Sequence, residues 1–520
     1  MKNNIYIYLF FLVFIYLCSV GVRYHQHITI VNHPEFNAGG DIILTTHDGY
    51  RWLRFASDHK ANTYTDGLDQ LSGLPEHSMK PPMLPLLSQL IAYFSDGDLA
   101  VTGSLMTVFL SGLFIFPLGL IFWIFGLPTA GLGAGLLGSL ALGYLGRTSA
   151  FQIDTDMLNL FFVSLGALLL VLAERGRTIL WSALLGLTMY IFWRWYFHSG
   201  FSVVYLALLI LMIRKNDIKT IVSSVLVYSI FVSLYLLFNG LKGIYEFIFA
   251  VAGNVVVVSV AELQRLTLDD NFELIGSYWW MVALGLLLSF SLKWRMLPLA
   301  VFYILGMMLF FRGNRYAMYL APMCGAGLGL VFDYMLSEKF RTLGYALIVS
   351  IMILFILKPH IDKIPAPVVS KDTYEGIRSI NNLEKDAVIA SLWDNGFIIE
   401  YLTGRTVVAD GASQFKVGSG LFAKAIFQTD CYKSASILNE IAGKKPVYLV
   451  FTPDMDKKLG SMMKTSGIWA KINSDDLVRK IVDTLYFKLH VIGLANIDCF
   501  KRLYRNNQAL SIYKVDPSCR

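Results

Sequence analysis

The stretch that decides the fold class runs from Asp154 to Ala173 and reads DTDMLNLFFVSLGALLLVLA. It begins with two acidic residues, after which the chain carries no charge over 157–173. A helix needs about 20 apolar residues to cross the hydrocarbon core of a bilayer. The stretch therefore predicts a transmembrane helix with two carboxylates at its start.

Ten further apolar runs lie before residue 358 and alternate with short charged breaks. The first run follows Lys2 and could be a signal peptide. No small-residue cleavage site follows it before Arg23, so we interpret it as a retained helix. A chain that is 55% hydrophobic and 16% charged fits this organisation. We predict eleven transmembrane helices, near 5–22, 99–124, 127–146, 157–173, 179–197, 200–213, 219–239, 277–292, 296–311, 316–336 and 342–357.

The charged breaks predict the orientation, because Lys and Arg favour cytoplasmic loops. With the N-terminus inside, every predicted inner loop but one is basic, and the exception is a bare turn around Leu127. Eleven crossings then place residues 358–520 outside, where the apolar runs 387–393 and 447–452 predict buried strands. The basic inner-loop residues are Arg175, Arg177, Arg214, Lys215, Lys219, Lys293, Arg295, Lys339 and Arg341.

The expected fold class is therefore a polytopic α-helical membrane domain followed by an external α/β domain. The membrane domain covers 1–357, with large outer loops at about 24–98 and 240–276, and the external domain covers 358–520. The net charge of +7 comes mostly from the inner loops and does not indicate nucleic-acid binding. The five cysteines show no metal-ligand spacing and allow no disulfide assignment.

The outer segments concentrate ionisable residues at the ends of apolar runs. Each has a structural interpretation: Asp154 or Asp156 could cap the next helix, and Asp48 could be a turn residue. Glu262 could be a solvated loop charge, and the arginines could reach the interface. As a set, clustered carboxylates favour a hard divalent cation, Mg²⁺ or Mn²⁺, which together with a guanidinium can stabilise a pyrophosphate leaving group. The set comprises Asp48, Arg147, Asp154, Asp156, Glu262, Arg312 and Arg315.

Five motifs follow one another along the chain: Asp48-Gly49-Tyr50, Arg147-Thr148 with Asp154-Thr155-Asp156, Ser259-Val260-Ala261-Glu262, Arg315-Tyr316 with Tyr319 and Pro322, and Trp393-Asp394 with Gly396, Arg405 and Asp410-Gly411. In this order they resemble the motifs of oligosaccharyltransferase catalytic subunits of the bacterial PglB and archaeal AglB type. They cover most of the chain, and their combination is specific although each motif alone is weak. The chain departs from the family at Leu392 and Asn395 of the Trp-Trp-Asp-Tyr-Gly signature, and Lys458 replaces the isoleucine of Met-x-x-Ile. Asp454 and Lys457 could instead fit the Asp-x-x-Lys variant of other branches.

The resemblance implies a GT-C membrane fold with an external soluble domain, and an enzyme in a bacterial or archaeal plasma membrane. Such an enzyme moves a glycan from a polyprenyl-pyrophosphate lipid to the asparagine of Asn-X-Ser/Thr in an acceptor polypeptide. The family has thirteen helices, and the predicted deficit of two falls between His198 and Asn239. The implied metal ligands, for Mn²⁺ or Mg²⁺, are Asp48, Asp154, Asp156 and Glu262, of which Asp48 and Glu262 also activate the acceptor amide. The implied pyrophosphate ligands are Arg147, Tyr196 and Arg315, and the implied acceptor-binding residues are Trp393, Asp394 and Met455.

Two other interpretations compete. A GT-C relative using a polyprenyl-phosphate sugar and another acceptor would keep the acidic motifs and change the Trp393 region, and part of that change is present. A transporter would carry ionisable residues at mid-membrane, whereas here they lie at the outer helix ends.

Overall fold

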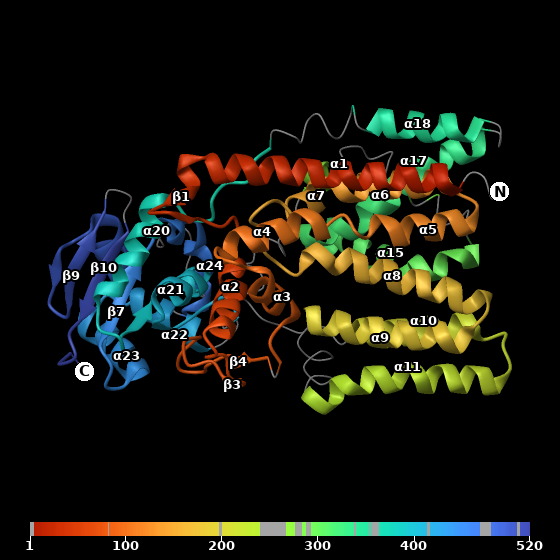
Figure 1. The fold of residues 1–520 in the computed structure, drawn as a ribbon. Helices are drawn as coiled ribbons and strands as arrows, with labels where there is room; N and C mark the ends of the chain where they lie inside the picture. Colours follow the sequence, from red (N-terminus) through yellow and green to blue (C-terminus); the bar gives the residue numbers. More distant parts are fainter. Residues whose placement is uncertain are drawn as a thin grey trace.

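The computed structural model describes residues 5–81, 83–196, 200–239, 267–275, 283–285, 287, 293–336, 340–352, 354, 363–412, 417–467, 480–506 and 510–519. Helices lie side by side in an elongated bundle, and a mixed α/β part containing the C-terminus lies at one end of it (Figure 1). The N-terminal end of α1 lies at the opposite end of the bundle. The two-part organisation expected from the hydropathy is therefore visible in the structure.

The bundle helices overlap the predicted spans. Four segments are long and apolar enough to cross a membrane, namely Ile5–Asn32, Leu99–Phe125, Asp156–Arg175 and Trp294–Phe311. The chain thus has the character of a multi-pass membrane protein. Range 277–292 lies largely outside the described residues, so the number of eleven spans stays a prediction. The helices are α1 (Ile5–Asn32), α4 (Leu99–Leu110), α5 (Ile115–Phe125), α6 (Pro128–Leu140), α7 (Leu142–Leu145), α8 (Asp156–Arg175), α9 (Thr178–Tyr196), α10 (Gly200–Ile213), α11 (Ile218–Asn239), α13 (Leu268–Leu274), α15 (Ala300–Met307), α16 (Leu309–Arg312), α17 (Ala317–Met335) and α18 (Arg341–Met352).

Helices α6 and α17 pack backbone against backbone. A Cβ on Gly133 would collide with the carbonyl oxygen of Gly325, and a Cβ on Gly325 would collide with that of Gly133. Small residues permit this close approach between membrane helices. Asp333 of α17 also accepts from the backbone N–H groups of Thr129 (3.0 Å) and Ala130 (2.8 Å), which caps α6 from the neighbouring helix. The two helices therefore form one unit.

The segment between α1 and α4 carries two helices and two short hairpins. Helix α2 spans His47–Lys60 and α3 spans Leu86–Phe94. Strand β1 (Asn37–Ala38) pairs with β2 (Asp41–Ile42), and β3 (Gly67–Leu68) pairs with β4 (Met79–Lys80), both antiparallel. Helix α1 continues to Asn32, ten residues beyond the predicted end of the first span.

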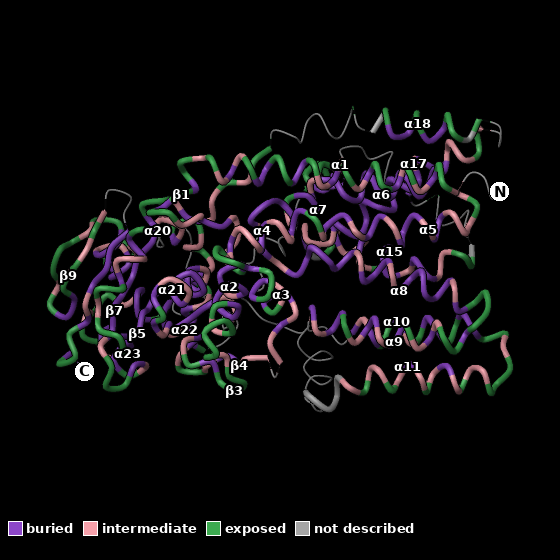
Figure 2. Tube along the Cα trace, in the orientation of Figure 1, coloured by how far each residue is buried: buried purple, intermediate pink, exposed green. Residues whose placement is uncertain are grey.

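The C-terminal part contains a six-stranded sheet of order β6-β5-β7-β10-β9-β8. Strand β5 is parallel to β6 and β7, whereas β10 is antiparallel to β7 and β9. Its strands β5, β7 and β10 are largely buried, whereas β9 and, in the bundle, α11 are mostly half-buried or exposed (Figure 2). The strands are β5 (Val388–Ala390), β6 (Thr406–Val407), β7 (Val447–Phe451), β8 (Asn496–Ile497), β9 (Phe500–Arg505) and β10 (Ser511–Val515). The helices are α20 (Lys371–Arg378), α21 (Gly396–Thr403), α22 (Val417–Ile426), α23 (Cys431–Ala442) and α24 (Leu459–Thr465).

Both predicted strands are present, as β5 and β7. A disulfide joins Cys499 to Cys519, a pairing that the cysteine spacing alone did not reveal. It links the turn between β8 and β9 to the segment that follows β10.

Candidate active site

The segments that carry the first two acidic motifs lie against each other. The backbone N–H of Thr45 donates to the carbonyl of Phe151 (3.4 Å). A Cβ on Gly49 would lie 3.4 Å from the carbonyl oxygen of Ile153 and 2.7 Å from a methyl group of Leu44, so the glycine permits this approach. Asp48 lies in the first turn of α2, and its side chain is exposed. The Thr45 hydroxyl also donates to the carbonyl of Ala150, 105 residues further along the chain. The fold therefore brings together two motifs that are about 100 residues apart in the sequence.

Arg147 lies between the two carboxylates of the second motif. Its Nε forms an ion pair with Asp156, and its Nη2 lies 3.9 Å from Asp154 Oδ2. Asn159, one turn along α8, donates to the other Asp156 oxygen (2.7 Å). Asp156 is buried and lies at the helix start, where a carboxylate also interacts favourably with the helix dipole. Its oxygens contact Arg147 and Asn159, so the side chain of Asp156 does not cap the helix as the structural interpretation expected.

Tyr196 and Arg315 approach the same place from two other helices. Arg315 Nη2 donates to the Tyr196 hydroxyl (3.1 Å), and Tyr196 lies within electrostatic range of Asp154 and Asp156. The preceding residue, Trp195, donates its indole N–H to the carbonyl of Thr155 (2.6 Å), which fixes the end of α9 against the acidic segment. The three predicted pyrophosphate ligands, Arg147, Tyr196 and Arg315, thus gather at the second acidic motif.

A cavity of about 240 Å³ opens beside Arg147. It lies at the junction of α7, the segment before α8, α13 and the turn that precedes Arg315. Its lining residues are Leu142, Gly143, Gly146, Arg147, Gln152, Leu274 and Asn314. The arrangement provides space for a ligand next to a guanidinium.

The donor chemistry of the acidic motifs fits a hard divalent cation, since carboxylate oxygens are the ligands that Mg²⁺ and Mn²⁺ prefer. Within the described part of the chain, no three His, Cys, Asp or Glu side chains are grouped closely enough to hold a metal. Asp154 and Asp156 share the positive charge of Arg147 instead. The fourth predicted ligand, Glu262, lies outside the described residues together with the rest of its motif, 259–261.

The predicted acceptor residues differ in accessibility. Trp393 and Met455 are buried, at 1% and 0% exposure, and pack in the core around the sheet. Asp394 has 21% of its side chain exposed, and its Oδ2 lies 3.2 Å from Lys458 Nζ. The structure therefore brings the residue at the isoleucine position of Met-x-x-Ile next to the signature aspartate. Of the three predicted residues, Asp394 is the one that an acceptor can reach.

Asn395 links the two acceptor motifs, a role that the sequence did not reveal. Its side-chain amide donates to Thr452 Oγ1 (2.8 Å) and to Asp454 Oδ2 (2.9 Å). In the sequence, Asn395 indicated only a departure from the tyrosine of the Trp-Trp-Asp-Tyr-Gly signature. Its amide instead holds the turn after β7 against the turn after β5.

The same turn is held from its other side by the helix 486–492. Asp456 accepts from the Tyr486 hydroxyl, and His490 Nε2 lies 3.3 Å from its Oδ1. Burial lowers the pKa of His490 from its usual value, although Asp456 opposes this shift. Sequence spacing gave no signal for this contact.

Arg23 of α1 supports the segment beside Arg147. It is buried, and it donates to the carbonyls of Thr148 (2.8 Å) and Ser139 (3.0 Å). A lone arginine at the end of an apolar run was the available signal, because ionisable residues at such positions are usually functional. Sequence reasoning used it only to limit the first span.

No protein-family model and no curated protein sequence matches the chain. Solved structures do match. The oligosaccharyltransferase AglB of Archaeoglobus fulgidus, in complex with an inhibitory peptide and a dolichol-phosphate, matches with a TM-score of 0.72 and 14% identity, over 97% of this chain and 80% of that one. The apo oligosaccharyltransferase of the same organism matches with a TM-score of 0.70 and 14% identity, over 96% and 80%. Its complex with Zn and sulfate gives 0.64 and 14%, over 96% and 79%. The chain has the fold of the archaeal oligosaccharyltransferase, which confirms the predicted resemblance.

Proposed function

We propose that the protein is an oligosaccharyltransferase that moves a glycan from a polyprenyl-pyrophosphate lipid to the asparagine nitrogen of Asn-X-Ser/Thr acceptors. The observation that carries this proposal is the convergence of the second acidic motif and the Arg315–Tyr196 pair on Arg147, which also lines a cavity. It occurs in a chain with the fold of an enzyme solved with an inhibitory peptide and a dolichol-phosphate.

On the donor side, Arg147 and Arg315 would bind the pyrophosphate oxygens. Positive groups fixed in place before the reaction stabilise charge that develops on a leaving group. The Tyr196 hydroxyl orients Arg315 by accepting its N–H. Arg147 is in turn oriented by Asp156, so the two guanidinium groups are held by partners on α9 and α8.

Asp48, Asp154, Asp156 and Glu262 would hold Mn²⁺ or Mg²⁺, and such an ion would neutralise charge on the pyrophosphate. The match to an archaeal enzyme solved with Zn and sulfate supports the use of a divalent cation. Asp48 would also accept a hydrogen bond from the acceptor amide, and its exposed side chain in the first turn of α2 supports this role.

On the acceptor side, Asp394 would accept a hydrogen bond from the Ser or Thr hydroxyl. Lys458 orients this carboxylate through their ion pair. Residues 358–520 would face outward, and the Cys499–Cys519 disulfide supports this placement, because disulfides persist in oxidising compartments.

One observation favours a second candidate, a GT-C glycosyltransferase that uses a polyprenyl-phosphate sugar and another acceptor. Trp393 and Met455 are buried, so the acceptor pocket of the resembling family is reduced here to Asp394 and its lysine.

A transfer assay separates the two. The purified protein is incubated with Mn²⁺, a polyprenyl-pyrophosphate oligosaccharide and an Asn-X-Thr peptide, with a Gln-X-Thr peptide as control. A mass shift confined to the asparagine peptide is the expected result. A parallel reaction contains a polyprenyl-phosphate sugar as the donor, and transfer in that reaction alone would support the second candidate. Modification of both peptides would contradict asparagine specificity.

A further inference from the structure

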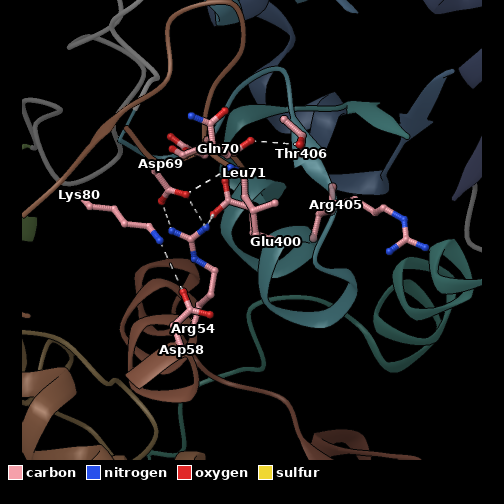
Figure 3. A network of polar contacts seen from close by, with 12 residues as sticks. Arg54, Asp58, Asp69, Gln70, Leu71, Lys80, Glu400, Arg405 and Thr406 are labelled. Atoms are coloured by element: carbon pink, nitrogen blue, oxygen red, sulfur yellow. Dashed lines mark hydrogen bonds and ion pairs between the residues drawn. The ribbon is translucent and has the colours of Figure 1, made fainter. Parts of the chain in front are cut away.

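A buried ionic cluster joins the first outer loop to the C-terminal part (Figure 3). Arg54 of α2 forms an ion pair with Asp69, and its Nη1 lies 3.2 Å from Glu400 Oε2 of α21. The Arg54 and Asp69 side chains are each 5% exposed, and that of Glu400 is 0% exposed. A single cation therefore faces two carboxylates that come from segments far apart in the sequence.

The loop around this cluster is paired with the edge of the sheet. The backbone N–H of Leu74 donates to the carbonyl of Val407 (2.9 Å), and that of Val407 donates to the carbonyl of Leu71 (2.8 Å). Ser72 donates its hydroxyl to Asp410, which is also buried. The outer loop thus extends the sheet beyond β6, and the cluster lies where the loop, α2 and α21 meet.

The two helices that share the cluster begin at the two ends of the proposed acceptor site. Asp48 lies in the first turn of α2, and Asp394 lies in the turn that leads directly into α21. One turn further on, the guanidinium of Arg51 lies over the ring of Phe397, 5.5 Å from its centroid. The position of α2 against α21 therefore determines where Asp48 lies relative to Asp394.

Stability alone does not account for this cluster. Desolvation of buried ions offsets most of their attraction, and apolar side chains of similar volume are often as stabilising. Ion pairs with two-point geometry, however, fix the relative position of the elements that carry them. Arg54 contacts Asp69 through Nη1 and Nη2 and Glu400 through Nη1, so its position is set from two sides.

We propose that Arg54 and Glu400 are positioning residues that set the distance between Asp48 and Asp394, and thereby couple recognition of the acceptor hydroxyl to transfer at the asparagine. The inference rests on the proposed function. It predicts that a disturbed cluster lowers the preference of the enzyme for an acceptor with a hydroxyl, without changing its use of the lipid donor.

The test compares the full-length enzyme with Glu400→Gln, which keeps the side-chain shape, and Arg54→Lys, which keeps the charge. The measurements are kcat/KM for Asn-X-Thr and Asn-X-Ala peptides and KM for the lipid donor. At a pH at which Glu400 is ionised, we expect the Thr-to-Ala preference to fall about tenfold in each variant, with donor KM unchanged. Arg378→Gln is the matched control, because Arg378 and Asp41 form another ion pair between the outer loop and the C-terminal part, with side chains 36% and 46% exposed. It should leave the preference unchanged.

An unchanged Thr-to-Ala preference in both variants would overturn the positioning role while the proposed function stands. So would an equal fall of all rates in proportion to the folded fraction, which would indicate a purely structural cluster. Failure of the unmodified enzyme to transfer any glycan would instead contradict the proposed function. If Glu400→Gln does not fold, Arg54→Lys decides the matter on the same measurements.

Discussion

Lys458 and Asp394 form an ion pair with 3.2 Å between Nζ and Oδ2, and both side chains are about one-fifth exposed, at 23% and 21%. The residue that departs from the family motif thus contacts the residue that is expected to bind the acceptor. A peptide can reach this contact, so substitutions in the pair should affect acceptor selection directly.

Substitutions in this pair should have unequal effects. Asp394→Ala removes the acceptor of the hydroxyl hydrogen bond, which is worth about 1.5–3 kcal/mol for a charged partner. Lys458→Ala removes a partly exposed ion pair, worth about 0–1 kcal/mol. We expect the peptide KM to rise much more for Asp394→Ala. An equal rise in both variants would show that the lysine itself binds the acceptor.

Threonine and serine acceptors should be used with similar efficiency. A threonine methyl buried on an apolar partner gains about 0.8 kcal/mol, which is about fourfold in affinity. Lys458 has a charged head in place of an apolar isoleucine side chain, so this gain is not expected here. Asn-X-Ala should be used much less efficiently than either, because it lacks the hydroxyl that Asp394 would bind. The measurement is kcat/KM for the three peptides, and a clear threonine preference would show that another apolar side chain contacts the methyl.

The acidic motifs should be required for transfer, with different effects on stability. Asp48→Ala should abolish transfer because it removes a proposed ligand of the metal and the acceptor. It should leave Tm unchanged because Asp48 is exposed. Asp156 is buried against Arg147, so Asp156→Ala leaves that guanidinium with less compensation and should also lower Tm. EDTA should inhibit the enzyme, and Mn²⁺ or Mg²⁺ should restore it. Full activity in the presence of chelator would contradict the metal role.

The buried cluster should make stability depend on pH. Burial raises the pKa of Glu400 well above its usual value, while Arg54 opposes this shift. Between the ordinary glutamate pKa, about 4.3, and the raised value, the unfolded state loses a proton that the native state keeps. Stability must therefore fall as pH rises through this window. Tm of Glu400→Gln should fall less steeply than that of the unmodified protein, and parallel curves would show that Glu400 is ionised in the folded state.

The orientation can be tested with cysteine labelling in a Cys431→Ser background. An impermeant reagent should label Lys444→Cys in intact cells, since this residue is exposed in the C-terminal part. Lys215→Cys, exposed between α10 and α11, should react only after permeabilisation. The opposite pattern would reverse the topology and exclude a donor on the outer face.

The positions of the bundle helices could be predicted because an apolar run is a local signal. The end of α1 could not. Arg23 ends the apolar run and the polar Gln26 and His27 follow it, but all three are buried with distant partners. Arg23 donates to the carbonyl of Thr148, Gln26 donates to the carbonyl of Lys363, and His27 Nδ1 lies 2.8 Å from Ser104 Oγ. Hydropathy treats such polar residues as the end of a span, because it contains no information on what they will contact.

In the candidate site, too, local patterns could be predicted from the sequence and distant contacts could not. The acidic motifs and the arginines could be identified from short patterns, and the fold brings the second motif, Arg147 and Arg315 together. The contact between Ser72 and Asp410 spans 338 residues, and no periodicity or spacing indicates it. The burial of Trp393 was likewise not indicated: a tryptophan at the carboxyl end of a strand favoured a binding site, whereas the side chain lies in the core.

The glycine contact between α6 and α17 has a consequence for the choice of donor. Helix α6 leads through α7 to Arg147, and α17 begins two residues after Arg315. Because the two backbones touch at Gly133 and Gly325, the helices cannot slide past each other without a collision. The spacing of the two arginines is therefore set before any lipid arrives. A group that must reach both cations is then selected by its length, so a diphosphate and a monophosphate would be distinguished by their span rather than by their charge.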